Sequence, residues 1–142
     1  MMWAAISNDR KTDLVHVPGN LTAVRYINEI LQPHLMHVID QQRELLQQDN
    51  ARPHTARVAM DNINVLPWPS KSPDFNPIEY LWDQLDKRVR QRQPPPQTLD
   101  QLRQMLQHKW RTIPRNNVRN LIKSMPRRCR AVLAARGGHT RY

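Results

Sequence analysis

The stretch from residue 43 to residue 66 reads RELLQQDNARPHTARVAMDNINVL, and its pattern decides the fold. Residues 43–48 predict a short strand that ends on Asp49, and residues 54–61 predict a short helix. A second strand is expected over residues 63–66. Strands that alternate with helices in this way indicate an α/β layer fold.

Before this stretch, the chain is predicted to form a β-hairpin. An apolar run over residues 2–7 is followed by the polar turn 8–11, and residues 12–17 then alternate with β-branched side chains. A strand that starts at Met2, with no cap or linker before it, leads us to expect a further piece upstream.

A helix is predicted to follow the hairpin. Asn20 or Thr22 can cap this helix, which should run to Leu35 and bend or divide at Pro33. Its apolar face is expected to hold Val24, Ile27, Ile30 and Leu31.

Three more helices are predicted, over residues 78–89, 98–113 and 117–135. In the first of them, apolar side chains recur at spacings of three and four, which is typical of an amphipathic helix. The proline run 94–96 ends this element, and Thr98, or Gln97 just before it, begins the next one. Pro126 is expected to interrupt the last helix.

The net charge of +10 is concentrated in the C-terminal part of the chain. Residues 1–81 hold 7 Lys and Arg against 9 Asp and Glu, whereas residues 82–142 hold 15 against 3. Such an excess favours a polyanionic partner, usually a nucleic acid, although an acidic membrane surface or a merely solvated helical face would also fit. The residues expected to contact a nucleic acid are Arg88, Arg90, Arg92, Arg127, Arg128 and Arg130.

Cysteine content and hydropathy narrow the class of protein. Cys129 is the single cysteine, so an internal disulfide and a cysteine-rich zinc site are excluded. No apolar run approaches the ~20 residues that cross a bilayer, and residues 1–7 lack the basic start of a signal peptide. We therefore expect a cytosolic or nuclear protein without a membrane partner.

The first candidate site residue is Asp49, which ends the predicted strand beside Asn, His and Thr side chains. Strand ends in α/β folds are where binding and catalytic sites collect. Asp49 could instead cap the helix or turn that follows it, and the segment alone leaves both interpretations open.

The second candidate is Glu79, in the first turn of a helix whose start is fixed by Pro77. A glutamate at this position interacts favourably with the helix dipole, and this alone would explain its presence. Equally, the rigid helix start could hold Glu79 toward Asp49. Carboxylates are suitable ligands for Mg²⁺, and two such ions support phosphodiester chemistry. Two acids alone rarely suffice for that chemistry.

His54 and three tryptophans have plainer alternatives. His54 follows a proline at a helix start and could touch a phosphate or an acid, but we predict a partly exposed structural histidine. Trp68, Trp82 and Trp110 could stack on bases, yet their helical or proline-rich contexts favour packing.

The two acidic segments together resemble a known family. Residues 48–56, QDNARPHTA, and 66–82, LPWPSKSPDFNPIEYLW, resemble the second and third acidic blocks of Tc/mariner-type transposases. The terminus 136–142, RGGHTRY, is similar to that family's end, and the likeness is weakest over residues 32–44. The resemblance implies a ribonuclease H-like fold and a triad of two Asp and one Glu. That triad holds two Mg²⁺ or Mn²⁺ ions while a transposon is excised and joined elsewhere.

By this resemblance, Asp49 is the second acid and Glu79 the third, and both are catalytic metal ligands. The first acid belongs on an opening strand expected before Met1, so the implied fold is an incomplete ribonuclease H-like α/β domain that lacks its first, central strand. This part is assigned to residues 1–92, and the basic C-terminal helices of the same domain to residues 93–142. Without the central strand the sheet should split and expose edges that aggregate or recruit a missing piece.

The implied function is that of a DDE transposase fragment that is inactive alone. The spacing from Asp49 to Glu79 is about five residues shorter than the family's usual pattern, roughly one and a half helical turns, and this could displace one acid from the other. The alternative is a non-enzymatic, basic nucleic-acid-binding remnant. DNA is the expected partner, with a homodimer or pairing with intact transposase, and the nucleus is the expected location.

Overall fold

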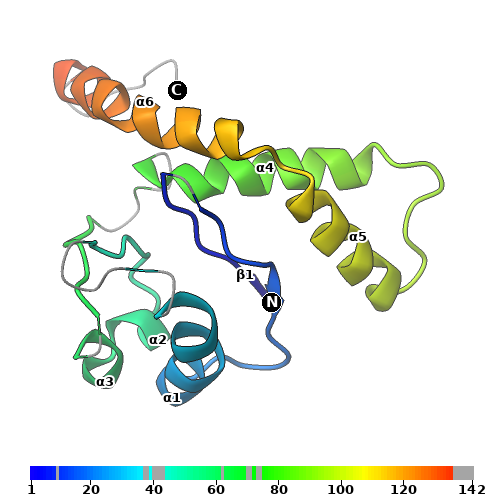
Figure 1. Ribbon diagram of the computed structural model, residues 1–142, viewed down its shortest axis with the longest axis horizontal. Helices are drawn as coiled ribbons and strands as arrows, with labels where there is room; N and C mark the ends of the chain where they lie inside the picture. Colours follow the sequence, from blue (N-terminus) through cyan, green and yellow to red (C-terminus); the bar gives the residue numbers. More distant parts are fainter. Residues whose placement is uncertain are drawn as a thin grey trace. The chain divides into compact units, whose positions relative to one another are not determined.

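The computed structural model describes residues 1–8, 10–36, 39, 44–61, 63–69, 72 and 75–135 (Figure 1). The chain forms two compact units. Unit 1 consists of residues 1–4 and 12–71, and unit 2 consists of residues 5–11 and 72–142. Within the described ranges, no helix is long and apolar enough to cross a membrane.

Unit 1 begins with the predicted hairpin, which is confirmed. Strand β1 (Met2–Trp3) pairs antiparallel with β2 (Val15–His16), so that Met2 lies opposite His16. The pairing continues beyond the strands, because the Met1 ammonium donates to the Val17 carbonyl at 3.0 Å and the Val17 N–H donates to the Met1 carbonyl at 2.9 Å. The hairpin tip, where Ile6 bridges Lys11, belongs to unit 2.

The predicted first helix is present as α1 (Ala23–Arg25) and the π-helix η1 (Tyr26–Leu35). Thr22 caps it, since its hydroxyl accepts the Arg25 N–H at 3.3 Å. The helix continues through Pro33 and is not divided there. Its buried residues are Tyr26, Ile27, Ile30, Leu31 and Leu35.

Val24 does not join that buried face, and the prediction for it was wrong. Its side chain is 60% exposed. In η1 the Met36 N–H donates to the Leu31 carbonyl five residues earlier, at 2.8 Å. The wider turns begin only at Tyr26, after Val24, and the other three residues predicted for this face, Ile27, Ile30 and Leu31, are buried.

The two strands predicted around Asp49 are reduced to one parallel bridge between Leu46 and Val65. The Leu46 N–H donates to the Asn64 carbonyl at 2.8 Å, and the Leu66 N–H donates to the Leu46 carbonyl at 2.9 Å. In the part of the chain that the structure describes, this bridge is not joined to the two-stranded β1–β2 sheet. The predicted split of the sheet is thus seen among these residues, while Arg43 lies outside them.

The single helix predicted over residues 54–61 is replaced by two short ones, α2 (Arg52–Thr55) and α3 (Arg57–Met60). They are separated at Ala56, whose ψ of 134° is extended. Four-residue helices are too short to be stable alone, so local contacts and not helix propensity hold them.

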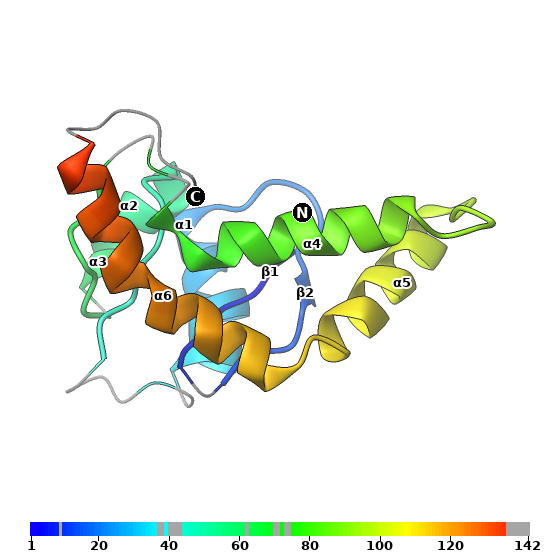
Figure 2. The ribbon, with the colours of Figure 1, turned by 90° about the horizontal axis from the view of Figure 1, so that it is seen from above.

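Unit 2 contains the hairpin tip and three helices, α4 (Pro77–Arg90), α5 (Leu99–Arg111) and α6 (Arg115–Ala134). Both α5 and α6 contact α4 (Figures 1 and 2). Thr98 begins α5 as predicted, because its hydroxyl accepts the Gln101 N–H at 3.2 Å. The buried residues of this unit are Leu81, Leu85, Met105, Trp110, Ile113, Val118 and Leu121.

The predicted interruption at Pro126 was wrong, since α6 is continuous from Arg115 to Ala134. A proline removes one backbone N–H from the ladder, and the 20 residues of α6 with a buried face at Val118 and Leu121 outweigh that local loss.

The C-terminal end of α5 is capped from the hairpin tip. The Lys11 ammonium donates to the carbonyls of Trp110 at 2.5 Å, Arg111 at 3.2 Å and Ile113 at 2.7 Å. It also lies 5.6 Å from the Trp110 ring centroid. A cation at this position satisfies carbonyls that the helix leaves without partners and interacts favourably with the helix dipole.

Candidate functional site

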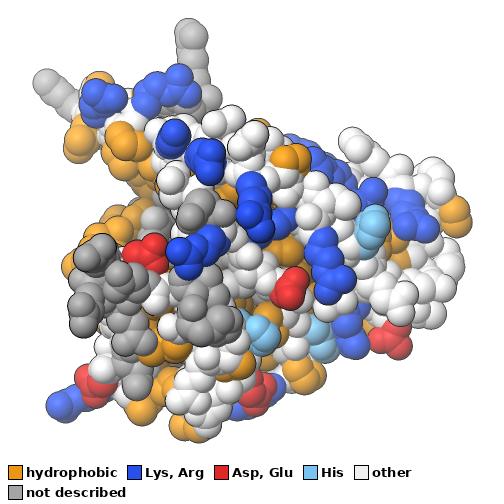
Figure 3. All heavy atoms as spheres, in the orientation of Figure 1, with side chains coloured by type: hydrophobic (Ala, Val, Ile, Leu, Met, Phe, Trp, Pro, Cys, Tyr) orange, Lys and Arg blue, Asp and Glu red, His pale blue; other side chains and the backbone are white. Residues whose placement is uncertain are grey.

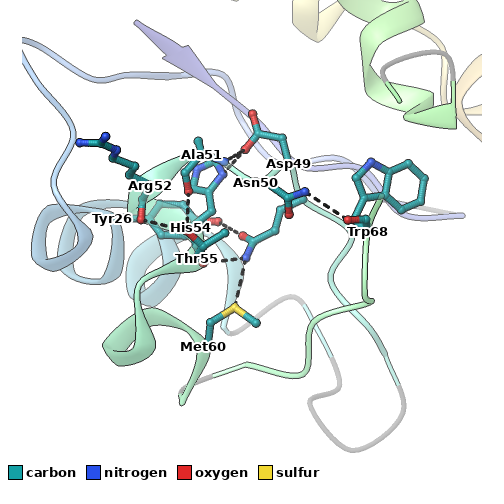
Figure 4. A network of polar contacts seen from close by, with 10 residues as sticks. Tyr26, Asp49, Asn50, Ala51, Arg52, His54, Thr55, Met60 and Trp68 are labelled. Carbon is teal, nitrogen blue, oxygen red and sulfur yellow. Dashed lines mark hydrogen bonds and ion pairs between the residues drawn. The ribbon is translucent and has the colours of Figure 1, made fainter. Parts of the chain in front are cut away.

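Asp49 lies directly after the bridged Leu46 strand, in the loop that leads to α2 (Figure 4). Its Oδ1 accepts the Ala51 N–H at 3.1 Å and lies 2.5 Å from His54 Nδ1. The carboxylate therefore forms the turn before α2, which is the structural role that the sequence left open. Its side chain is nevertheless 65% exposed, and Oδ2 takes part in none of the hydrogen bonds described.

His54 contacts the Asp49 carboxylate, so one of the roles considered for it, contact with an acid, is seen. Its side chain is only 14% exposed, and its ring lies against Tyr26 with the centroids 4.4 Å apart. The histidine is therefore packed on one side and directed at Asp49 on the other (Figure 4).

A buried polar contact lies beneath His54. Gln48 is 9% exposed, and its Oε1 accepts the Tyr26 hydroxyl at 2.7 Å. Its Nε2 donates to the His54 carbonyl at 3.2 Å. Burial, and then the negative charge of Asp49, raise the pKa of Tyr26 well above its ordinary value, so the hydroxyl remains a donor.

Sequence reasoning missed both Tyr26 and Gln48. The available signal was a glutamine inside a predicted buried strand, next to Asp49, because a buried polar side chain needs a partner. The partner itself lies 22 residues away in the sequence, and no local pattern identifies it.

A second hydrogen bond, made by Asn50, also fixes the loop that carries Asp49. The Asn50 amide donates to the Trp68 carbonyl at 3.1 Å, which ties the segment after one bridged strand to the segment after the other. Asp49 thus follows a strand end fixed at two further points, by His54 and by Asn50 (Figure 4).

Glu79 lies in the first turn of α4, as predicted. The Asn76 side chain accepts the Ile78 N–H at 3.4 Å, the Glu79 N–H donates to the Asn76 carbonyl at 3.1 Å, and Pro77 is buried. Glu79 is exposed on this fixed first turn, where its charge also favours the helix. Asp49 lies in unit 1 and Glu79 in unit 2, and each is described within its own unit.

The donor atoms of these acids fit a hard divalent cation. Carboxylate oxygens are ligands that Mg²⁺ and Mn²⁺ prefer, and Asp49 is held through Oδ1 while its side chain stays exposed. Across the described ranges, no group of three or more His, Cys, Asp and Glu side chains comes together to hold a metal ion.

The arginines predicted to bind DNA differ on α4. Arg90 pairs with Asp86 on the same helix, with Nε 2.7 Å from the carboxylate. Arg88 is half-buried, and Arg92 is exposed just after the helix. Ion pairing reduces the charge that Arg90 offers to a partner.

On α6, Arg127 and Arg130 are exposed, whereas Arg128 is held within unit 2. The Arg128 Nε donates to the Ser124 hydroxyl at 3.0 Å, and its guanidinium lies 5.8 Å from the Tyr80 ring centroid. Trp82 and Trp110 pack as predicted, since their rings stack with centroids 5.2 Å apart, whereas packing of the half-buried Trp68 stays a prediction.

Comparison with known proteins identifies relatives over the whole chain. It is 32% identical over 151 residues to the transposable element Tcb1 transposase of Caenorhabditis briggsae, with 100% of this chain and 54% of the relative covered. It is 39% identical over 103 residues to the Tc1 transposase of Caenorhabditis elegans, with 69% and 37% covered. The chain thus spans about half, or less, of the length of these relatives.

Solved structures show the same fold. The Mos1 transposase catalytic domain, determined with Raltegravir and Mg, matches with a TM-score of 0.72 and 20% identity, over 93% of this chain and 71% of that one. The Mos1 strand transfer complex matches with a TM-score of 0.72 and 22% identity, over 93% of this chain and 40% of that one. This likeness confirms the ribonuclease H-like fold. Because residues 1–103 also match the family model described as DDE superfamily endonuclease, this chain belongs to the DDE superfamily endonuclease family.

Proposed function

We propose that this chain supplies Asp49 and Glu79 as the second and third metal-binding acids of a DNA transposase, which cleaves phosphodiester bonds and transfers strands. The observation that carries the proposal is the geometry of Asp49. Its Oδ1 is held by His54 and the Ala51 N–H just after the Leu46–Val65 bridge, while Oδ2 takes part in none of the hydrogen bonds described and the side chain is exposed.

The proposed cofactor is Mg²⁺ or Mn²⁺. Mos1 catalytic domains with Mg and with Mn share this fold, and the two acids offer oxygen donors that suit either ion. When bound, such ions supply activation of a water molecule and stabilisation of the leaving oxygen. The residues of this chain orient the ligands: His54 holds Asp49, and Pro77 with Asn76 fixes the turn that carries Glu79.

DNA is the proposed partner, and the nucleus the proposed location. The excess of basic residues after Leu81 supports the first, and the second follows from the substrate. Mos1 paired-end complexes share this fold, which supports a homodimer or pairing with an intact transposase as the working state.

The 142 residues contain matches to two of the three acids of the DDE triad, so we propose that the purified chain binds DNA but does not nick it. The test is plasmid nicking in Mg²⁺ by this chain and by a chimera that joins it to the part of the Tcb1 transposase that it does not span.

The chimera is expected to nick the plasmid, and Asp49→Asn and Glu79→Gln should each abolish nicking while leaving DNA binding intact. A chimera whose nicking survives both substitutions would refute the assigned roles. Nicking by the isolated chain, lost in both variants, would show instead that two acids suffice.

A further inference from the structure

Helix α6 differs from the other long helices in its charges. Its 20 residues include no Asp or Glu, and its first turn holds no acid. Five of its basic residues recur at intervals of four, four, four and three, and we refer to them as the α6 stripe: Arg115, Arg119, Lys123, Arg127 and Arg130.

The stripe lies on the solvent side of α6. At 3.6 residues per turn, its members fall within about a third of the helix circumference and extend about 22 Å along the axis. All five are exposed, whereas Val118 and Leu121 are buried on the opposite side. Basic side chains are visible along the edge of the molecule where α6 lies (Figure 3).

Four of the five stripe residues have no described carboxylate as a partner. Among the described residues, Arg115, Arg119, Lys123 and Arg130 form no ion pair. Elsewhere, five basic side chains pair with an acid three or four residues away, and the pairs are Arg25–Glu29, Arg57–Asp61, Lys87–Asp83, Arg90–Asp86 and Arg103–Asp100. The α6 stripe therefore carries four basic side chains whose charge no described carboxylate offsets.

We infer that the α6 stripe is a binding surface for the phosphate backbone of duplex DNA. Duplex DNA carries one negative charge per about 1.7 Å of its axis, so a surface of this length meets more than enough phosphates for every basic residue of the stripe. The inference rests on the proposed function in that DNA is the polyanion. It adds Arg115, Arg119 and Lys123, which lie beyond the residues matched by the family model.

An acidic membrane is the less suitable partner for this helix. A helix that lies on a bilayer inserts its apolar face between the lipids. The apolar face of α6 is already used, because Val118 and Leu121 are buried and α6 contacts α4. The exposed side offers charge without a continuous apolar surface.

The test compares the salt dependence of DNA binding for two variants with the same loss of charge. The stripe variant is Arg115→Gln/Arg119→Gln/Lys123→Gln. The control is Arg57→Gln/Lys87→Gln/Arg103→Gln, which removes three basic residues that are ion-paired in place. Binding of a random-sequence duplex is measured by fluorescence anisotropy in EDTA from 50 to 200 mM KCl, settings chosen to span the steep part of the salt dependence.

For the stripe variant, the slope of log K against log salt should fall by about 2.7, or about 0.9 for each lost phosphate contact. For the control, the same slope should change by less than about 0.9, the value expected for one phosphate contact. Each single stripe substitution should account for about a third of the effect, and this can be measured even if the triple variant is unstable. Because EDTA prevents catalysis, an inactive chimera would leave this result unchanged.

Two outcomes would overturn the inference. An equal fall in both triple variants would mean that net charge alone determines binding. An unchanged slope in the stripe variant would show that DNA binds elsewhere. Vesicles of phosphatidylserine and phosphatidylcholine provide a further arm, in which binding that is lost in the stripe variant, with DNA binding unaffected, would assign the surface to membranes.

Discussion

At the scale of single residues, the Asp49 carboxylate depends on His54 for its orientation. The pair joins Oδ1 to Nδ1, and the imidazole is fixed in turn by the Tyr26 ring. Loss of a hydrogen-bonding partner behind a metal ligand typically lowers metal affinity or activity by about 10- to 100-fold. In the active chimera, His54→Leu should therefore raise the Mn²⁺ concentration for half-maximal nicking by about this factor.

The conservative variant His54→Asn separates positioning from packing. Its amide nitrogen can take the place of Nδ1, so the Mn²⁺ requirement should return toward that of the unmodified chimera. If both variants lose thermal stability equally and neither changes the Mn²⁺ requirement, His54 is structural only.

Tyr26 and Gln48 should show strong energetic coupling. Gln48→Leu leaves a buried hydroxyl without an acceptor, a loss expected to lower the free energy of unfolding by about 1–3 kcal/mol. Tyr26→Phe leaves the amide oxygen without its donor. The double variant should lose less than the sum of the two, as measured by urea denaturation of all four proteins, whereas strict additivity would contradict a shared buried bond.

The raised pKa of Tyr26 predicts how stability depends on alkaline pH. The folded state retains the proton above the ordinary tyrosine pKa of about 10, at which the unfolded chain releases it. The contribution is thus fully present below about pH 10 and is lost as the pH rises from there toward the folded pKa. Unfolding followed by circular dichroism from pH 8 to 11.5, a range set around that value, should decline less steeply for Tyr26→Phe. Identical pH profiles would contradict the assignment.

At the scale of elements, the sequence predicted best where a cap and an apolar face coincide. The first turns of α4 and α5 are set by Pro77 and Thr98, and both helices end near the expected residues. Sequence pattern was less informative for α2 and α3, because both helices contact α1, which lies far away in the sequence, and no local pattern shows the extended Ala56 between them. The ends of the strands near Asp49 could not be predicted either. The single bridge between Leu46 and Val65 depends on both segments, and residues 43–48 alone do not determine where pairing starts or stops.

The cap that Lys11 places on α5 is a further element-scale contact, and it is testable. Hydrogen bonds from a charged group contribute about 1.5–3 kcal/mol, so Lys11→Met should lower the free energy of unfolding by about this amount. Lys109→Met is the matched control, because it removes the same charge from the last turn of α5 without removing the cap. Chemical denaturation that gave the same loss for both would reduce the contact to a general charge effect.

At the scale of the whole molecule, family membership could be read from two segments, but the working site could not. Asp49 and Glu79 were identified by their motifs, and the structure fixes the surroundings of each in its own unit. The effect of the shortened spacing between them, and the boundary assigned at residue 92, remain predictions. Long-range partners such as Tyr26 for Gln48 follow from the tertiary fold, which no local pattern encodes.

The contact between Lys11 and the end of α5 also has a temporal consequence. Lys11 and Trp110 are 99 residues apart in the chain, and both belong to unit 2. During synthesis the hairpin tip leaves the ribosome long before α5 does. The Lys11 ammonium therefore stays hydrated until translation of α5 is complete. The contact between Lys11 and α5 therefore forms late in folding. A nascent chain arrested before Trp110 would expose the hairpin tip to chaperones.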